Sequence, residues 1–364
     1  MKILVYMGHP AHFYLFRNTI VELSKNGHSV KILIQKKEIL EELLKSEGFE
    51  FTNILREGRS SSKIGMLRGM IKRDYRILKH CLKNKPDILL GTSVEFPHIG
   101  KLLGIPSINF NEDDCPAVPL YCKLSYPLSS FILAPENCNT GKWENKTIAY
   151  KGYHELSYLY PKNFPPDKKY IKDKIDLSRK FFLIRFSKLA AHHDEGKTGI
   201  NAEIAKRVID ILTSHGNVYI TSERELEPEF EKYRIGINPI HMHHALYYAD
   251  MYIGDSQTMT AEAAVLGTPA LRFNDFVGRL SYLEELEHKY NLTYGIKTSE
   301  PEKLYGKIEE ILKMKNRKEV WRKRKEKMLK DKIDVTAFFV WFIENYPKSA
   351  KIIKKNPEYQ ERFR

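Results

Sequence analysis

The chain has 364 residues and a formal net charge of +14, with 42% apolar and 29% charged residues. This length allows two domains with a sizeable core, and the composition is typical of a globular protein. No apolar run approaches the ~20 residues that span a bilayer, which excludes an integral membrane protein. With no signal peptide before the first predicted strand and four cysteines without metal-type spacing, we expect a cytoplasmic protein with reduced thiols.

Residues 1–162 are predicted to form an N-terminal Rossmann-like domain, because short apolar runs alternate with helical patterns. The expected strands are 2–7, 30–35, 51–55, 88–90, 107–110, 131–134 and the segment around 148–152. The expected helices are 13–26, 38–47, 72–84 and 99–103. The polar loop 56–63 is interpreted as a mobile active-site loop. Since no GxGxxG fingerprint follows a strand, no dinucleotide cofactor is expected.

The proline-containing segment 163–167 is the best linker candidate, and a second Rossmann-like domain is predicted over residues 168–334. Its expected strands are 180–186, 217–221, 251–253 and one that ends at 273. Its expected helices are 201–214, 242–249, 260–266, 282–289, 301–314 and 318–332. Residues 335–346 are predicted to form a final helix, and the rest, to residue 364, a basic tail.

The segment 242–273 carries the clearest chemical signal. A turn cluster at 254–258 follows a buried strand and precedes a helix. Such a loop presents unpaired backbone N–H groups and the positive end of the helix dipole, where diphosphates bind. Glu262 is placed about one turn into the helix, where its carboxylate could reach a sugar hydroxyl. The alternative is an ordinary α/β turn, in which Glu262 only favours the helix N-terminus.

This segment also carries a resemblance. Asp255-Ser256, Glu262-Ala263 and residues 266–270 resemble the donor-site segment of UDP-N-acetylglucosamine 2-epimerases and related GT-B glycosyltransferases. The chain resembles more closely the DUF354 family of GT-B-like proteins. The segments that carry this second resemblance are 1–3, 8–12, 152–159, 185–187, 191–194 and 258–264. It implies two Rossmann-like domains facing a cleft, with the C-terminal helix returning to the first domain.

Several residues after the strands of the first domain are candidates for acid/base chemistry. An imidazole suits general-base activation of an acceptor hydroxyl, so His9 and His12 are candidates, against the alternative of helix-start histidines with satisfied rings. Glu112 and Asp113 lie where the related epimerases keep a catalytic carboxylate, although adjacent acids can also form a simple turn. Glu95 is a weaker candidate of the same kind.

In the second domain, Arg185 and Ser187 stand at the end of a buried strand. An arginine there suits phosphate oxygens, and a structural salt bridge is the alternative. His193, between His192 and Asp194, and the loop 196–199 are further candidates for the cleft or for anion binding.

No metal is predicted. His241, His243 and His244 have spacings that seldom converge on one ion. No Asp-x-Asp pair occurs in the sequence, which argues against a transferase that holds its nucleotide through a divalent cation. Backbone amides and basic side chains would neutralise the diphosphate instead.

These observations favour a glycosyltransferase that uses a nucleotide-diphosphate sugar, with UDP as the expected nucleotide, in the synthesis of a cell-surface polysaccharide or glycoconjugate. The resemblance implies donor contacts from Arg185, Ser187 and residues 255–258, which are Asp255, Ser256, Gln257 and Thr258, and from Glu262. His12 or Asp113, with Glu112, would serve as base for a glycan or lipid-linked acceptor. The alternatives are a non-hydrolysing UDP-sugar 2-epimerase and a non-catalytic sugar-nucleotide or polyanion-binding protein.

The positive charge indicates what kind of partner the protein contacts. Much of the excess lies in 313–332 and 348–355. No nucleic-acid-binding module is present, so DNA or RNA is not the expected partner. Peripheral contact with an anionic membrane is the preferred interpretation.

Overall fold

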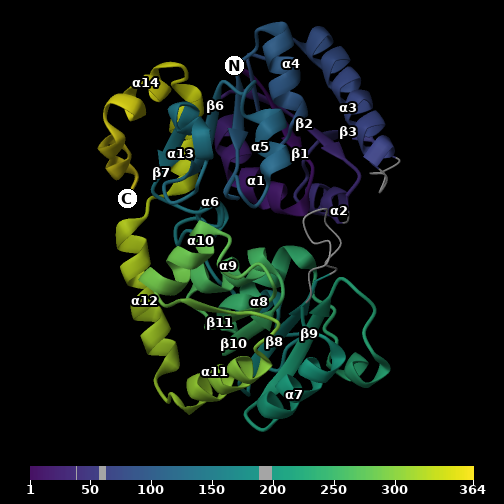
Figure 1. Ribbon diagram of the computed structural model, residues 1–364, viewed down its shortest axis with the longest axis vertical. Helices are drawn as coiled ribbons and strands as arrows, with labels where there is room; N and C mark the ends of the chain where they lie inside the picture. Colours follow the sequence, from purple (N-terminus) through teal and green to yellow (C-terminus); the bar gives the residue numbers. More distant parts are fainter. Residues whose placement is uncertain (38, 57–62, 188–198) are drawn as a thin grey trace. The chain divides into compact units, whose positions relative to one another are not determined.

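The computed structural model describes residues 1–37, 39–56, 63–187 and 199–364. The chain divides into two compact units (Figure 1). Unit 1 comprises Met1–Asn163 together with Ile333–Arg364, and unit 2 comprises Phe164–Lys332. Unit 1 is therefore discontinuous in sequence, because its C-terminal segment follows unit 2.

In the described residues, unit 1 is built on a seven-stranded parallel sheet in the order β3-β2-β1-β4-β5-β6-β7. Its strands are β1 (Lys2–Met7), β2 (Ser29–Gln35), β3 (Phe51–Leu55), β4 (Ile88–Gly91), β5 (Ser107–Phe110), β6 (Phe131–Pro135) and β7 (Thr147–Tyr150). Its helices are α1 (Pro10–Lys25), α2 (Leu40–Ser46), α3 (Lys63–Asn84), α4 (Glu95–Leu103), α5 (Pro119–Ser125), α6 (Leu156–Leu159), α13 (Val335–Glu344) and α14 (Lys348–Lys355). The predicted α/β architecture of this half is confirmed.

Helices cover both faces of this sheet, which explains why its strands read as continuous apolar runs rather than alternating ones. On one face, Ile77 of α3 and Phe96 of α4 pack in a cluster with Leu4 and Leu89 of the strands. On the other face, α1 and α13 supply an aromatic cluster. The ring centroids of Phe16 and Phe110 are 4.9 Å apart, as are those of Phe110 and Phe339, and Phe339 lies 5.2 Å from Tyr150.

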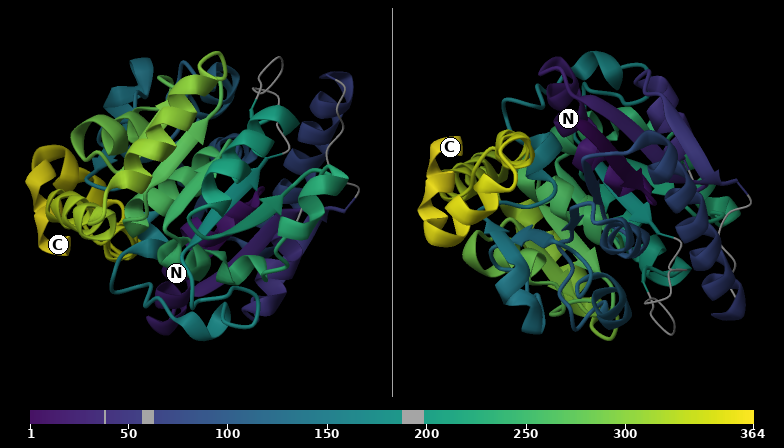
Figure 2. Two further views of the ribbon diagram at one scale, coloured as in Figure 1. Left: turned by 90° about the horizontal axis from the view of Figure 1, so that it is seen from below. Right: turned by 90° about the horizontal axis from the view of Figure 1, so that it is seen from above.

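Unit 2, as far as it is described, contains a five-stranded parallel sheet in the order β12-β11-β10-β8-β9. Its strands are β8 (Phe181–Phe186), β9 (Asn217–Ser222), β10 (Met251–Gly254), β11 (Ala270–Phe273) and β12 (Thr293–Ile296). Its helices are α7 (Ala202–Thr213), α8 (Met242–Tyr248), α9 (Gln257–Leu266), α10 (Ser281–Glu284), α11 (Pro301–Lys313) and α12 (Arg317–Asp331). Figure 2 shows strands of this sheet running between helices.

The predicted return of the C-terminal helix to the first half is confirmed, since α13 packs against α1 and α6. The segment expected as a basic tail is instead folded. It forms α14 and a 3-10 helix, η6 (Pro357–Phe363). Gln360 accepts a hydrogen bond from the backbone N–H of Lys151 at 2.7 Å, and the Lys151 ammonium pairs with Glu358 at 2.7 Å. This hydrogen bond and this salt bridge therefore fix the C-terminal segment to unit 1.

Four predicted helix starts were late. The helix predicted over 13–26 begins at Pro10, and the helix predicted over 99–103 begins at Glu95. The helix predicted over 72–84 begins at Lys63 and includes Gly65 and Gly69, although each glycine in a helix costs about 1 kcal/mol relative to alanine. The helix predicted over 260–266 begins at Gln257. The short helices α5 and α6 and the strand β12 were not predicted. The expected loop at 56–63 falls mostly outside the described residues.

Candidate functional site

Because the strands of unit 1 are parallel, the loops after β1, β5 and β7 meet at one edge of the sheet. The first of these loops carries His9 and His12. His9 is exposed and is the N-cap of α1, with its Nδ1 accepting a hydrogen bond from the Ala11 N–H at 3.2 Å. The helix-start interpretation therefore describes His9 well.

His12 lies in the first turn of α1, and the Gly8 N–H donates to its Nδ1 at 3.1 Å. Burial, together with the neighbouring imidazoles of His9 and His154, lowers the pKa of His12 to about 3. The neutral ring then carries its proton on Nε2. In this state His12 is a hydrogen-bond donor at Nε2, which is a poor arrangement for the base role expected of it.

The loops after β5 and β7 bring together Glu112 and His154. The Glu112 carboxylate accepts from the His154 backbone N–H at 3.1 Å, and its other oxygen lies 3.3 Å from His154 Nδ1. Among the described residues, His154 Nε2 is buried and has no hydrogen-bond partner. A carboxylate that holds Nδ1–H leaves Nε2 as a proton acceptor, as in catalytic triads.

Two further acids lie beside this pair. Asp113 is half-buried and Glu155 is buried, and both carboxylates act to raise the pKa of His154. Desolvation dominates nevertheless and lowers that pKa to about 4, so the ring is neutral near pH 7. Sequence reasoning missed His154 and Glu155 as site residues. The signal that could have found them is their position directly after the last strand of the first domain.

Glu95 is paired with an arginine of another helix. It begins α4 and is buried, and its carboxylate pairs with Arg73 Nε of α3 at 2.6 Å. Removing one partner of such a pair would leave a buried charge uncompensated. The structure therefore gives Glu95 a place in the packing of two helices rather than beside Glu112 and His154.

In unit 2, the turn after β10 leads directly into α9. Ser256 is the N-cap, and its Oγ accepts from the Met259 N–H at 3.3 Å. Gln257 and Thr258, predicted to lie in the turn, are instead the first helical residues. N–H groups in the first turn of a helix have no intrahelical acceptor, so this point is a suitable place for an anion.

Asp255 holds the loops around this helix start. Its Oδ1 accepts from the Ser187 N–H at 2.7 Å, and its backbone carbonyl accepts from Asn274 Nδ2 at 2.8 Å. It is buried, and desolvation raises its pKa. Asp255 thus connects the loops that follow β8, β10 and β11, and Ser187 contributes its backbone to that connection.

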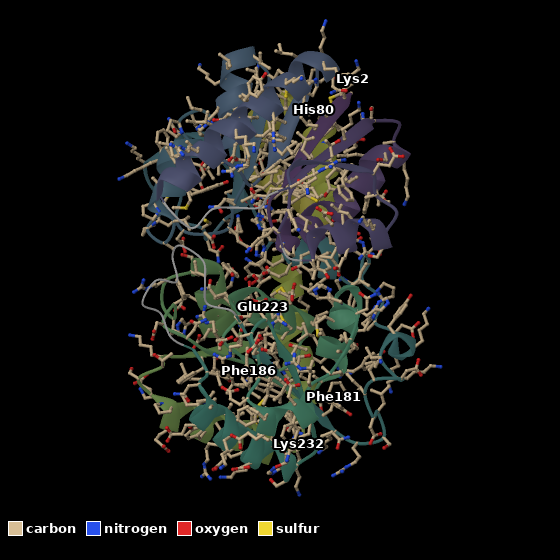
Figure 3. The ribbon with its side chains drawn as sticks, turned by 90° about the vertical axis from the view of Figure 1, so that its right-hand side faces the viewer. Lys2, His80, Phe181, Phe186, Glu223 and Lys232 are labelled. Atoms are coloured by element: carbon tan, nitrogen blue, oxygen red, sulfur yellow. The ribbon has the colours of Figure 1, made fainter. Side chains whose placement is uncertain are left out.

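Arg185, at the end of β8, forms a salt bridge with Glu223, which follows β9. Figure 3 labels Phe181 and Phe186 at the two ends of β8 and Glu223 beyond the carboxyl end. The salt bridge is the alternative that the sequence left open for Arg185. A phosphate would have to share this guanidinium with Glu223, or displace the carboxylate.

Glu262 is paired with a histidine of α8. Its Oε1 lies 3.0 Å from His243 Nε2, and both side chains are 6% exposed. His244 instead accepts from the Asp167 N–H at 3.1 Å, and His241 stacks on Tyr170 with ring centroids 4.4 Å apart. His244 also stacks on Tyr170, whereas His243 is paired with Glu262. Within the described part of the chain, no group of three or more His, Cys, Asp or Glu side chains is placed to hold a metal.

The remaining candidates, His192, His193, Asp194 and the loop 196–198, lie outside the described residues. Gly199 is described, and a Cβ there would lie 2.6 Å from Asp255 Oδ2. The chain at Gly199 therefore passes directly beside the Asp255 carboxylate.

Comparison with known proteins identifies the family and the fold. Residues 1–291 match the family described as "Protein of unknown function (DUF354)". No curated protein matches the chain. Among solved structures, the UDP-GlcNAc 2-epimerase of Methanocaldococcus jannaschii, in complex with UDP-GlcNAc and UDP, is similar with a TM-score of 0.63 and 15% identity. The similarity covers 86% of this chain and 94% of that one.

Two other solved structures have the same architecture. The UDP-GlcNAc 2-epimerase of Neisseria meningitidis, bound to UDP-GlcNAc, gives a TM-score of 0.58 at 15% identity and covers 91% of this chain and 99% of its own. A spinosyn rhamnosyltransferase complexed with spinosyn aglycone gives 0.61 at 15% identity and covers 95% and 100%. The fold is therefore GT-B-like, shared by epimerases and glycosyltransferases. At these identities the likeness establishes the fold alone.

Proposed function

The chain belongs to the DUF354 family, and from that membership and its GT-B-like fold we propose that it is a glycosyltransferase that uses a UDP-linked sugar. The observation that carries the proposal is the Glu112–His154 pair, whose unpartnered Nε2 is suited to take the proton of an acceptor hydroxyl. In this proposal unit 1 binds the acceptor and unit 2 binds the donor. The product would be a cell-surface polysaccharide or glycoconjugate.

The proposed step is a group transfer. The acceptor oxygen forms a bond to the anomeric carbon, the bond from that carbon to the β-phosphate oxygen breaks, and UDP leaves with the electron pair. His154 Nε2 receives the hydroxyl proton, and Glu112 stabilises the imidazolium that results. In this proposal His12 offers a hydrogen-bond donor at Nε2 to the substrate. Asp113 adds a second carboxylate at the same edge of the unit 1 sheet.

For the donor, the first turn of α9 at Ser256, Gln257 and Thr258 would contact the diphosphate through backbone N–H groups. Arg185 would neutralise the leaving group by sharing its charge between Glu223 and phosphate oxygens. Glu262 would contact ribose or sugar hydroxyls, with His243 fixing the orientation of its carboxylate. Asp255 and Ser187 would act by holding the loops in place.

The test begins with binding. Thermal-shift and calorimetric titrations with UDP, GDP, CMP, TDP and their sugars, at fixed salt, should show one preferred base. A ligand at a hundredfold excess over its Kd adds about 2.7 kcal/mol of stability. Glu262→Gln keeps an acceptor for His243 but removes the charge, so we expect at least tenfold weaker donor binding. The exposed Glu229→Gln in the same unit is the control. Unchanged donor affinity in Glu262→Gln would contradict this donor site.

Turnover is the second test. With the donor known, His154→Gln should lower kcat by about 10²–10⁴-fold and leave donor affinity unchanged. Equal kcat in wild type and His154→Gln would rule out the proposed base. Binding of a sugar nucleotide with no turnover for any acceptor would favour the non-catalytic alternative.

One observation favours a second candidate function. Glu112, Asp113, His154 and Glu155 place several ionisable groups at one edge of unit 1, and an epimerase needs acid/base groups beside the sugar. Proton NMR of the UDP-sugar with enzyme alone decides between the two. Isomerised sugar nucleotide without acceptor would identify a 2-epimerase, and the transferase proposal would then be wrong.

A further inference from the structure

Helix α3 of unit 1 exposes a stripe of large apolar side chains. Leu67 is 54% exposed, Ile71 59%, Tyr75 64% and Leu82 59%. At about 100° per residue, these four side chains fall within an arc of about 80°. A different arc, which includes Ile77, packs on the sheet. The stripe is therefore not the side of the helix that the fold uses.

The next arc of the same helix is basic. Arg68, Lys72, Lys79 and Lys83 are exposed and fall within about 60° of each other, directly beside the apolar stripe. The surface of α3 that faces away from the core thus has an apolar half and a cationic half. Figures 1 and 2 show α3 running along the outside of unit 1.

Neighbouring helices also carry exposed apolar residues. Leu102 at the end of α4 is 66% exposed, and Leu120 on α5 is 63% exposed. Helix α4 packs against both α3 and α5. Six of the nine exposed large hydrophobic residues in the described part of the chain lie on these three helices. Single exposed apolar residues are normal on protein surfaces, but a gathering of them marks an interaction site.

The charge of this surface distinguishes between the partners that could bind to it. Nucleic acid would use the cationic half but has no use for an apolar stripe. A second copy would bring its own cationic arc against this one, in a chain of net charge +14, which is repulsive. A bilayer with anionic lipids meets both halves at once. Leu, Ile and Tyr enter the boundary between headgroups and acyl chains, and Lys and Arg pair with the headgroups.

We propose that the exposed face of α3 is the surface by which this protein binds an anionic membrane. The contact is peripheral, since no helix in the described residues is long and apolar enough to cross a bilayer. This assigns the membrane contact to α3 rather than to the basic C-terminal segment. The contact does not depend on the proposed transferase activity. If that activity is correct, it places unit 1 where a lipid-linked acceptor is held.

The test is co-sedimentation of the full-length protein with vesicles, without nucleotide. Vesicles of phosphatidylcholine mixed with the anionic lipid phosphatidylglycerol should bind the protein. Vesicles of phosphatidylcholine alone should bind it at least tenfold more weakly, and salt should reduce binding. The double variant Ile71→Glu/Tyr75→Glu should lose vesicle binding, because carboxylates would replace the apolar contact and repel the headgroups.

Matched variants separate α3 from general positive charge. Lys72→Glu/Lys79→Glu should weaken binding at least tenfold, whereas Lys348→Glu/Lys351→Glu on α14 makes the same charge change and should have little effect. Circular dichroism and the Tm of each variant check folding. Wild-type binding by Ile71→Glu/Tyr75→Glu, or an equal loss in the α14 variant, would overturn the proposal. Self-association without vesicle binding would overturn it in favour of a second copy.

The outcome is distinguishable from that of the transferase proposal. Vesicle binding is measured without a donor, and donor binding is measured without lipid. The α3 variants change no residue placed in the donor or acceptor chemistry, so their affinity for the sugar nucleotide should equal that of the wild type. A protein that binds UDP-sugars but not vesicles would contradict the membrane surface alone.

Discussion

Two histidines at one sheet edge differ in which ring nitrogen the protein holds. A backbone N–H donates to Nδ1 of His12, whereas the carboxylate of Glu112 lies against Nδ1 of His154. The first arrangement leaves a donor at Nε2, and the second leaves an acceptor there. Histidine is thus a hydrogen-bond donor at one position of the site and an acceptor at the other. The partner of Nδ1 determines which of the two it is.

Burial of these imidazoles has a consequence for stability against pH. The pKa of His154 is lowered to about 4 in the folded state, from an ordinary value of 6.5. The unfolded chain therefore binds a proton more readily, and the free energy of unfolding falls as pH drops from about 6.5 to 4. At pH 5 this difference amounts to about 2 kcal/mol for one such group.

We therefore predict a flatter pH dependence in His154→Gln. Urea unfolding at pH 7.5 and pH 5 should show a smaller loss of stability in the variant than in the wild type, by about 2 kcal/mol. The exposed His215→Gln serves as control and should keep the wild-type slope. An unchanged slope in His154→Gln would mean that this ring protonates equally well in the folded and unfolded states.

Sequence alone could identify the residues at strand ends but not their partners. Glu262 was correctly placed in a helix after a buried strand, but its partner His243 lies on another helix. Likewise the Arg73–Glu95 pair joins two helices of unit 1. Such ion pairs arise from how elements pack together, and no local pattern encodes them. His154 is the opposite case, because its position after a strand was visible in the sequence.

At the scale of elements, the docking of α13 on unit 1 depends on one close approach. A Cβ at Gly152 would lie 2.4 Å from Val335 Cγ2, at the first residue of α13. Asp334 caps this helix by accepting from the Ala337 N–H at 3.0 Å. The start of α13 is therefore fixed in position on both sides, with no room for a methyl group at residue 152.

A pair of glycine substitutions tests this contact. Gly152→Ala should destabilise the protein by about 1–3 kcal/mol, because the added methyl must displace α13. Gly306→Ala, in α11, meets nothing within 4 Å and should stabilise the protein by about 0.5–1 kcal/mol. Thermal or urea unfolding of both variants shows whether each substitution raises or lowers the free energy of unfolding. Stabilisation by Gly152→Ala would show that the α13 contact is looser than described.

Element types were predicted well because parallel strands buried on both faces produce long apolar runs. Boundaries were harder where local signals conflict. Ser256 is a typical N-cap residue, yet the Gly254-Asp255-Ser256 cluster also reads as a turn, so the start of α9 was placed three residues too late. In α3, Gly65 and Gly69 concealed the first part of the helix.

At the scale of the whole molecule, unit 2 is one continuous stretch and unit 1 is made of two. Unit 2 has its own sheet and its own buried residues, such as Tyr252 and Leu271. Unit 1 needs Phe339 from its C-terminal segment to complete the aromatic cluster with Phe110 and Tyr150. The two units therefore differ in whether an uninterrupted piece of chain can form them.

Truncation should expose this difference. A fragment of residues 164–332 should fold alone, with cooperative thermal unfolding and native-like circular dichroism. A fragment of residues 1–332 should retain a folded unit 2 but bind a dye specific for exposed apolar surface, because Phe338, Phe339 and Phe342 are missing. Adding residues 333–364 as a separate peptide should reduce the dye signal. A well-folded unit 1 in the 1–332 fragment would contradict this dependence on α13.

The discontinuity of unit 1 also sets an order of events during synthesis. Translation proceeds at roughly 5–20 residues per second, so the ribosome needs about 10–30 s to make residues 164–332. Throughout that time the nascent first half has no α13, and Phe110 and Tyr150 remain uncovered. Unit 2 can complete its fold before unit 1 does, although it is encoded later. The cell must therefore keep an apolar surface from aggregating until the last segment of the chain emerges.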